Sequence, residues 1–189
     1  MQRKLFILIF LIFNLLINTK FLLANDKSKI IKSLNNIETL EFQFTQTSLD
    51  KEENGICFLK RPYFLKCLYN DKIKKVLIIN RKNLVIYQKK YNKTYYYPVS
   101  RSYFVDLIDK KKFENLILNA NLILDNDVLK VNYFEEKKGK VTFFFKKENF
   151  DLFGWEIIDL SNNRTNFKIY NIVKNQNFEN KIFSIPETN

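Results

Sequence analysis

The chain has 189 residues, of which 46% are hydrophobic and 16% aromatic, so it can bury a sizeable core and is not a disordered protein. It contains no histidine, which excludes Ser-His-Asp and Cys-His catalysis and most zinc sites. The net charge of +12 accompanies an excess of lysine, asparagine, isoleucine and phenylalanine over alanine, glycine and proline. That bias accounts for the charge, so we expect no binding to nucleic acid.

The N-terminus has the layout of a secretory signal peptide. Two basic residues precede an apolar run over residues 5–17, and the small Ala24 stands before a polar stretch. The run is short for a membrane span, although Lys20 near the cleavage position leaves an uncleaved anchor as the alternative. We expect residues 1–24 to be removed near Ala24 and residues 25–189 to form one domain in an oxidising compartment.

The apolar periodicity then separates helices from strands. Residues 28–37 carry apolar side chains at helical spacing, and residues 39–47 alternate between apolar and polar side chains. Further strands are expected at residues 55–61, 64–70, 74–80, 83–90 and 94–98. Residues 101–118 return to helical spacing behind a possible cap at Ser102, which predicts one or two short helices. Strands resume at residues 128–136, 140–147, 154–160, 165–172 and 181–185.

This succession of elements predicts a mainly β (α+β) fold. Strands that follow one another through short turns form a meandering antiparallel sheet. So long a sheet has to curl into a barrel or a sandwich.

The two cysteines stand at equal distances from Pro62. If Lys60 pairs with Phe64 across a hairpin turn, Cys57 lies directly opposite Cys67 at a separation that a disulfide tolerates. Export favours oxidation, so we expect a Cys57–Cys67 disulfide. Two buried free thiols are the alternative.

Several short motifs follow one another in a characteristic order. "FQFTQT" precedes "NGICFLKRPYFLKCLYND" and "LIINRKNLVIYQ", which place an F-x-Q strand, a K-R-P strand end and a strand ending in tyrosine in succession. A helical segment follows near residues 101–108. The C-terminal part adds Trp155, Asp159, Asn163, Thr165, Ile169, Asn177, Phe183 and Pro186. This ordered set resembles the outer-membrane lipoprotein carrier family, LolA, over nearly the whole chain after residue 24.

Two positions depart from the family's pattern. Arg81, Lys82 and Asn83 replace a turn that usually contains glycine, and Cys67 stands where an aromatic residue is common. The detail of the pocket therefore does not follow from the resemblance.

The resemblance implies a fold and a function. The fold is an incomplete, curled antiparallel β-barrel with an N-terminal helix and short lid helices over its concave face. The function is that of a non-enzymatic carrier in the periplasm of a Gram-negative bacterium, which shields the acyl chains of lipoproteins in an apolar cavity and transfers them from the inner to the outer membrane. The implied partners are acylated lipoproteins and an inner-membrane lipoprotein-releasing transporter, with an outer-membrane receptor left open. We expect a monomer without cofactor or metal.

The alternation in the strands and the apolar face of the helical segment predict an acyl-chain pocket. Its expected members are Phe42, Phe44, Leu59, Leu65, Phe104, Leu107 and Ile108. The same hairpin has a second apolar face, which consists of Ile56, Phe58, Phe64 and Leu68. From the sequence alone, either face of the hairpin could line the pocket. The resemblance makes Arg61 a latch that hydrogen-bonds the lid. Because Arg61 lies at a turn, we expect it at the rim of the pocket.

Three other functions remain open from the sequence. A carrier or sensor of another lipid, such as a glycolipid, would have the same fold. A secreted hydrolase would use carboxylate pairs such as Glu135/Glu136 or Asp125/Asp127, which lie in polar, turn-like stretches. A nucleic-acid-binding module would use the basic and aromatic residues 89–98, which suit an edge strand protected by lysines equally well.

Overall fold

The structure is a computed structural model that describes four stretches of the chain, residues 25–49, 51–81, 83–99 and 102–186. The predicted signal peptide, residues 1–24, lies outside them. Within these stretches, no helix is long and apolar enough to cross a membrane.

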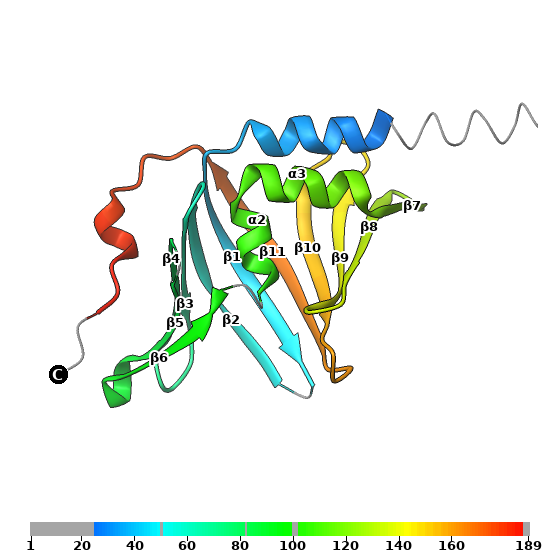
Figure 1. Cartoon of the computed structure of the whole chain (residues 1–189). Coiled ribbons are helices and arrows are strands. Elements are labelled where there is room, and N and C mark those ends of the chain that lie inside the picture. The colour runs from blue at the N-terminus through cyan, green and yellow to red at the C-terminus, as the bar shows by residue number, and fades with distance from the viewer. Residues whose placement is uncertain (1–24, 50, 82, 100–101, 187–189) are drawn as a thin grey trace, which may run out of the picture.

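The described residues form one antiparallel sheet of eleven strands (Figure 1). The strands are β1 (Thr39–Ser48), β2 (Lys51–Lys60), β3 (Phe64–Tyr69), β4 (Lys75–Asn80), β5 (Asn83–Gln88), β6 (Lys93–Pro98), β7 (Asn121–Asp125), β8 (Val128–Glu135), β9 (Gly139–Lys146), β10 (Leu152–Ile158) and β11 (Arg164–Lys174). Their spatial order is β6-β5-β4-β3-β2-β1-β11-β10-β9-β8-β7. The sheet thus consists of two meanders that meet where β1 pairs with β11. It is not closed, because β6 and β7 are its edges.

Helices fill the concave side of the curled sheet. A helix over residues 25–35 precedes β1, and α2 (Tyr103–Ile108) and α3 (Lys110–Asn119) connect the two meanders. Ser102 caps α2 by accepting a hydrogen bond from the amide of Phe104, and Asp109 caps α3 in the same way. Figure 1 shows the sheet curving around α2 and α3, with the N-terminal helix beside α3. The predicted incomplete barrel with lid helices is confirmed.

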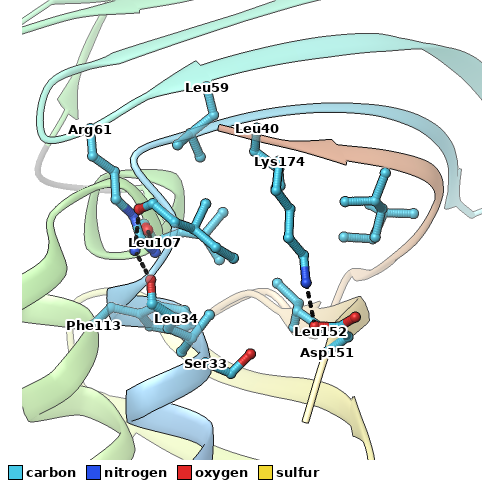
Figure 2. A pocket seen from close by; sticks show the side chains of 13 residues that line it. Ser33, Leu34, Leu40, Leu59, Arg61, Leu107, Phe113, Asp151, Leu152 and Lys174 are labelled. Carbon is cyan, nitrogen blue, oxygen red and sulfur yellow. Dashed lines mark hydrogen bonds and ion pairs between the residues drawn. The ribbon is translucent and has the colours of Figure 1, made fainter. Parts of the chain in front are cut away.

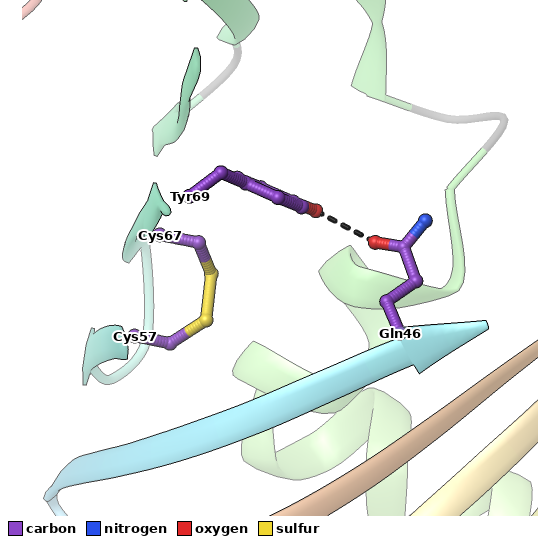
Figure 3. The surroundings of a disulfide bond; sticks show 4 residues. All are labelled: Gln46, Cys57, Cys67 and Tyr69. Carbon is purple, nitrogen blue, oxygen red and sulfur yellow. Dashed lines mark hydrogen bonds between the residues drawn. A yellow bond between two sulfur atoms is a disulfide. The ribbon is translucent and has the colours of Figure 1, made fainter. Parts of the chain in front are cut away.

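The β2–β3 hairpin has the predicted register. Lys60 pairs with Phe64, and Cys57 lies opposite Cys67 and is joined to it by a disulfide (Figure 3). The Arg61–Pro62 peptide bond in the connecting turn is cis. The pairing deduced from the spacing about Pro62 is therefore confirmed.

The C-terminal segment covers the convex face of this hairpin. Phe183, fully buried in the 3-10 helix η3 (Asn180–Phe183), stacks on Phe64 with ring centroids 5.3 Å apart, and Phe178 meets Phe58 edge to face at 5.7 Å. Lys66 Nζ donates to the carbonyl oxygen of Ile182 at 2.9 Å. The second apolar face of the hairpin is therefore the outer one, and a tail from the same chain packs against it.

Some predictions of secondary structure are wrong. Residues 181–185 were expected as a strand but contain η3, because Phe183 is held against the sheet surface instead of joining a sheet edge, and Asn80 Nδ2 donates to its carbonyl oxygen at 3.1 Å. Strand β7 was not expected, because its five residues directly follow α3 and resemble a continuation of the apolar helical pattern. The strand expected to reach residue 90 ends earlier, where the 3-10 helix η1 (Lys89–Tyr91) begins.

Candidate functional site

The concave face and its helices share one apolar cluster. Six of the seven residues predicted for the pocket are buried in it, namely Phe42, Phe44, Leu59, Leu65, Leu107 and Ile108. The strand residues reach it because alternate side chains of a strand point to the same face. The helical residues reach it because α2 and α3 lie over that face. The assignment of Phe42 and Leu59 to the inside agrees with their burial.

Phe104 is the half-buried member of the predicted set. Its ring lies edge-on to two aromatic rings, Trp155 at 5.9 Å and Phe167 at 5.5 Å between centroids. Trp155 and Phe167 are themselves stacked at 4.9 Å. Sequence reasoning did not assign these two residues to the site, although period-two alternation in β10 and β11 places both on the concave face. Phe104 thus rests on an aromatic platform contributed by the C-terminal meander.

A small apolar pocket lies between the N-terminal helix and the sheet (Figure 2). Leu34 and Ile37 line it from the helical side, Leu59 from the sheet and Leu107 from α2. Its free volume is only about 30 Å³, enough for about one water molecule. An apolar cavity of roughly 150 Å³ is needed to hold a molecule the size of benzene. In this conformation the cluster is therefore filled by its own side chains.

Two wider hollows flank the lid helix α2. One, of about 270 Å³, is lined by Phe104 together with Leu77, Ile86, Ile157 and Phe167. The other, of about 420 Å³, is lined by Ile108, Pro62, Tyr63, Arg81, Val99, Val105, Asp109 and Lys112. The predicted pocket residues thus belong to one cluster but do not surround one open cavity, because the helices occupy its centre.

Arg61 connects the hairpin turn to both covering helices. Its Nη1 donates to the carbonyl oxygens of Leu34 at 2.5 Å and Ile37 at 3.2 Å, which lie at the end of the N-terminal helix (Figure 2). Its Nη2 donates to the carbonyl oxygen of Leu107 in the last turn of α2 at 3.3 Å. The carbonyl oxygen of Leu34 also accepts from the amide of Ile37 at 3.2 Å, and a guanidinium has enough donors to serve several carbonyls near helix ends.

The predicted position of Arg61 at the rim is wrong. The side chain is buried, with only 9% of its surface exposed, and it lines the pocket. It became buried because two helices that are distant in sequence close over the turn. Burial lowers the pKa of Arg61 to about 10, while the nearby carboxylates of Glu38 and Asp109 act in the opposite direction. The guanidinium is therefore still charged at neutral pH.

The opposite end of α2 is attached to the β8–β9 turn. Lys138 Nζ lies 2.6 Å from Asp106 Oδ2 and 3.1 Å from Glu135, and the Tyr103 hydroxyl donates to the carbonyl oxygen of Gly139 at 2.7 Å. Burial raises the pKa of Asp106, and the hydrogen bond from Lys138 offsets this only in part. Sequence reasoning did not find this attachment, since its partners are 32 residues apart.

Comparisons with known proteins identify the family of this arrangement. The model of the family described as outer membrane lipoprotein carrier protein LolA matches residues 35–186. No curated protein matches the chain.

Solved structures share the fold at very low sequence identity. An uncharacterized conserved protein from Thermus thermophilus has a TM-score of 0.56 at 8% identity, over 87% of this chain and 94% of that one. A putative outer membrane lipoprotein-sorting protein domain from Vibrio parahaemolyticus has a TM-score of 0.51 at 7% identity, over 83% and 95%. A DUF1329 family protein from Desulfovibrio piger has a TM-score of 0.51 at 6% identity, over 86% and 97%.

At such identities these structures show a common fold alone, and their descriptions differ from one another. The family match carries more weight, because it covers everything from the end of the N-terminal helix to the C-terminal segment. The chain belongs to the outer membrane lipoprotein carrier protein LolA family.

Proposed function

We propose that this protein is a periplasmic carrier that shields the acyl chains of lipoproteins and transfers them from the inner to the outer membrane. The observation that carries the proposal is the contact of Arg61 with carbonyl oxygens of both helices over an apolar cluster. Such a cluster becomes a lipid site when the helices move outward, and it is sealed from water when they return.

The energies explain why a carrier needs its own helices inside the cavity. Burying an acyl chain of about sixteen carbons gains roughly 12 kcal/mol at about 0.8 kcal/mol per CH₂. A cargo held with all of that free energy would not be released. Because cargo entry must first displace α2 and its neighbours, part of the gain is spent on opening, and the net affinity becomes small enough for transfer.

Arg61 sets the balance between the closed and the open form in this proposal. Hydrogen bonds from a charged donor contribute about 1.5–3 kcal/mol each, so losing three of them makes the closed form less favourable. The Nε–H of Arg61 has no hydrogen-bond partner in the described part of the chain, which limits how strongly the closed form is held. The latch is therefore strong enough to close the empty protein and weak enough to yield to an acyl chain.

The test is release of a fluorescent acylated peptide to acceptor vesicles. We expect Arg61→Leu to bind the peptide and to release it at least tenfold more slowly than the wild type, because opening then costs less by about 1.4 kcal/mol or more. Arg164→Leu is the matched control, since Arg164 is exposed on β11 and 62% of its side chain is accessible.

Thermal unfolding must accompany the release measurement because Arg61 is buried. A folded Arg61→Leu variant with release as fast as the wild type would remove the latch from the proposal. Failure of the wild type to bind any acylated peptide would remove the carrier function itself.

A carrier or sensor of another lipid is the alternative function. The cluster is lined by apolar side chains that recognise any acyl chain, and nothing in its described residues selects a lipoprotein over a glycolipid. Mass spectrometry of lipids and peptides that co-purify with the protein from its native host separates the two.

The proposed function also covers the export of the protein, its donor and its lack of catalysis. Residues 1–24 direct export and are removed near Ala24, the donor is an inner-membrane lipoprotein-releasing transporter, and the carrier acts as a monomer without catalysis. Two carboxylates from the candidate hydrolase pairs support this, because Glu135 pairs with Lys138 at 3.1 Å and Asp125 pairs with Lys130 at 2.5 Å.

A further inference from the structure

The positive charge of the chain is concentrated in one arm of the sheet. Residues 72–98, which contain β4, η1, β5 and β6, have eight lysine or arginine residues and no aspartate or glutamate. Without residues 1–24 the net charge falls from +12 to +9, because three basic residues are removed. Outside the arm, that shortened chain has 21 basic and 20 acidic residues and is nearly neutral. A compositional bias alone would not place the charge in a single stretch.

The lysines of this basic arm (residues 72–98) are available to a partner. Lys72, Lys74, Lys89, Lys90 and Lys93 are exposed, and none of them forms an ion pair with a described carboxylate. Lys75 is the exception, since its Nζ lies 2.8 Å from Glu53. A patch of unpaired lysines on one arm attracts an anionic surface.

Tyrosines stand among these lysines. Tyr91 in η1 and the three consecutive tyrosines of β6 are exposed, the most exposed being Tyr96 at 65%. Tyr95 and Tyr97 pair with Ile86 and Leu84, so they border the concave face. β6 is an edge strand of the sheet, so these rings lie at its boundary. Tyrosine and lysine both combine an apolar body with a polar end, which suits the boundary between lipid and water.

We propose that the basic arm docks the protein on an anionic phospholipid surface. The lysines bind the headgroups, and the tyrosines of η1 and β6 insert at the headgroup level. A nucleic acid would satisfy the charge. Four exposed tyrosines gathered along a sheet edge favour a lipid boundary instead.

The basic arm lies next to the apolar hollow and to the start of the lid. Lys75, Leu77 and Ile86 of the arm line one side of the 270 Å³ hollow, and Phe104 of the lid lines another. β6 is also followed directly by the segment that leads into α2. An arm bound to a membrane therefore brings the mouth of the apolar cluster, and the start of its lid, close to the lipid.

The test measures binding of the cargo-free chain from residue 25 onward, which contains all the helices and strands described above, to vesicles. Vesicles of phosphatidylglycerol with phosphatidylethanolamine are compared with phosphatidylcholine vesicles by flotation. We expect binding to the anionic vesicles alone, and the triple variant Lys89→Glu/Lys90→Glu/Lys93→Glu should weaken it by about tenfold or more. A second triple variant, Tyr95→Ser/Tyr96→Ser/Tyr97→Ser, should lose the binding that persists at high salt.

The control carries the same change of charge elsewhere. Lys137, Lys140 and Lys168 are exposed lysines outside the arm, and their triple change to glutamate should leave vesicle binding within about twofold. Equal losses in both lysine variants, or binding to phosphatidylcholine as tight as to phosphatidylglycerol, would overturn the proposal. So would binding of a DNA duplex by a protein that ignores vesicles. Acylated-peptide binding in the same preparations tests the carrier function separately.

Discussion

At the scale of single residues, Arg61 shows which properties of a side chain can be predicted from the sequence and which cannot. The resemblance to the LolA family implied that Arg61 hydrogen-bonds the lid, and Arg61 donates to the carbonyl oxygens of Leu34 and Leu107. Its burial did not follow from the sequence, because a residue in a turn is exposed unless distant elements cover it. The N-terminal helix and α2 are such elements, and local patterns do not place them.

Phe104 gives the prediction that belongs to this scale. Phe104→Asp places an unpaired carboxylate against Trp155 and Phe167, which costs several kcal/mol when the cluster is sealed around an acyl chain. We expect binding of a fluorescent acylated peptide to be lost.

Tyr170→Asp is its control, because that tyrosine is 42% exposed. If Phe104→Asp binds the peptide as well as Tyr170→Asp does, the hollow under the lid is not part of the lipid site.

At the scale of elements, the buried Asp106 and the partly buried Glu53 connect parts of the fold, and their contributions to stability depend on pH in opposite directions. Asp106 attaches α2 to the β8–β9 turn, and burial raises its pKa. Glu53 attaches β2 to β4 through Lys75, and although burial acts to raise its pKa, hydrogen bonds from Lys51 and Lys75 lower it below its ordinary value of 4.5. A lowered pKa means that Glu53 contributes stability above 4.5 and loses that contribution as the pH falls through its folded value. The raised pKa of Asp106 has the opposite effect on stability, since the contribution of Asp106 to the free energy of unfolding grows as the pH falls.

The two carboxylates therefore predict opposite effects of amide substitution on acid stability. Between about pH 6 and pH 3, the melting temperature of Glu53→Gln should fall less steeply than that of the wild type. The melting temperature of Asp106→Asn should fall more steeply, because this variant lacks the stability that the wild type gains when Asp106 is protonated. Thermal unfolding at several pH values provides the measurement, and parallel curves for all three proteins would contradict the assignment.

At the scale of the whole molecule, the concave face of the sheet and part of its convex face are covered. Helices occupy the concave side, and the C-terminal segment covers β2, β3 and β4 on the convex side. In the proposed function, the concave face opens for cargo while the convex face holds the sheet together.

The convex side therefore supplies a prediction about stability alone. Phe183→Ala removes a fully buried ring that stacks on Phe64, and should cost about 3–5 kcal/mol of unfolding free energy. Binding of acylated peptide should stay unchanged in the fraction that is folded. Phe134→Ala, at a ring that is 64% exposed, should change stability by no more than about 0.5 kcal/mol.

Denaturant unfolding gives the stabilities, and titration with the peptide gives the affinities. A loss of affinity in Phe183→Ala without loss of stability would place the lipid on the convex face.

Local patterns predicted what depends on neighbours in sequence. Alternation gave most strands, and the symmetry about Pro62 gave the hairpin register and the disulfide. The failures involve contacts between distant residues. The segment around Phe183 has the composition of a strand, but the surface that it covers decided its conformation. The same holds for the aromatic platform of Trp155, which needs β10 beside β11 and α2 above them.

The pairing of β1 with β11 has a consequence for how the chain acquires its structure. Thr47 pairs with Asn166, and more than a hundred residues separate the two strands. The first six strands can assemble by local hairpin steps, but the second edge of β1 stays without a partner until the last strand arrives. Contacts between residues so distant in sequence form slowly, and until they form the unpaired edge of β1 can pair with other chains. During synthesis, the exposed edge of β1 is therefore a site where this protein is open to aggregation.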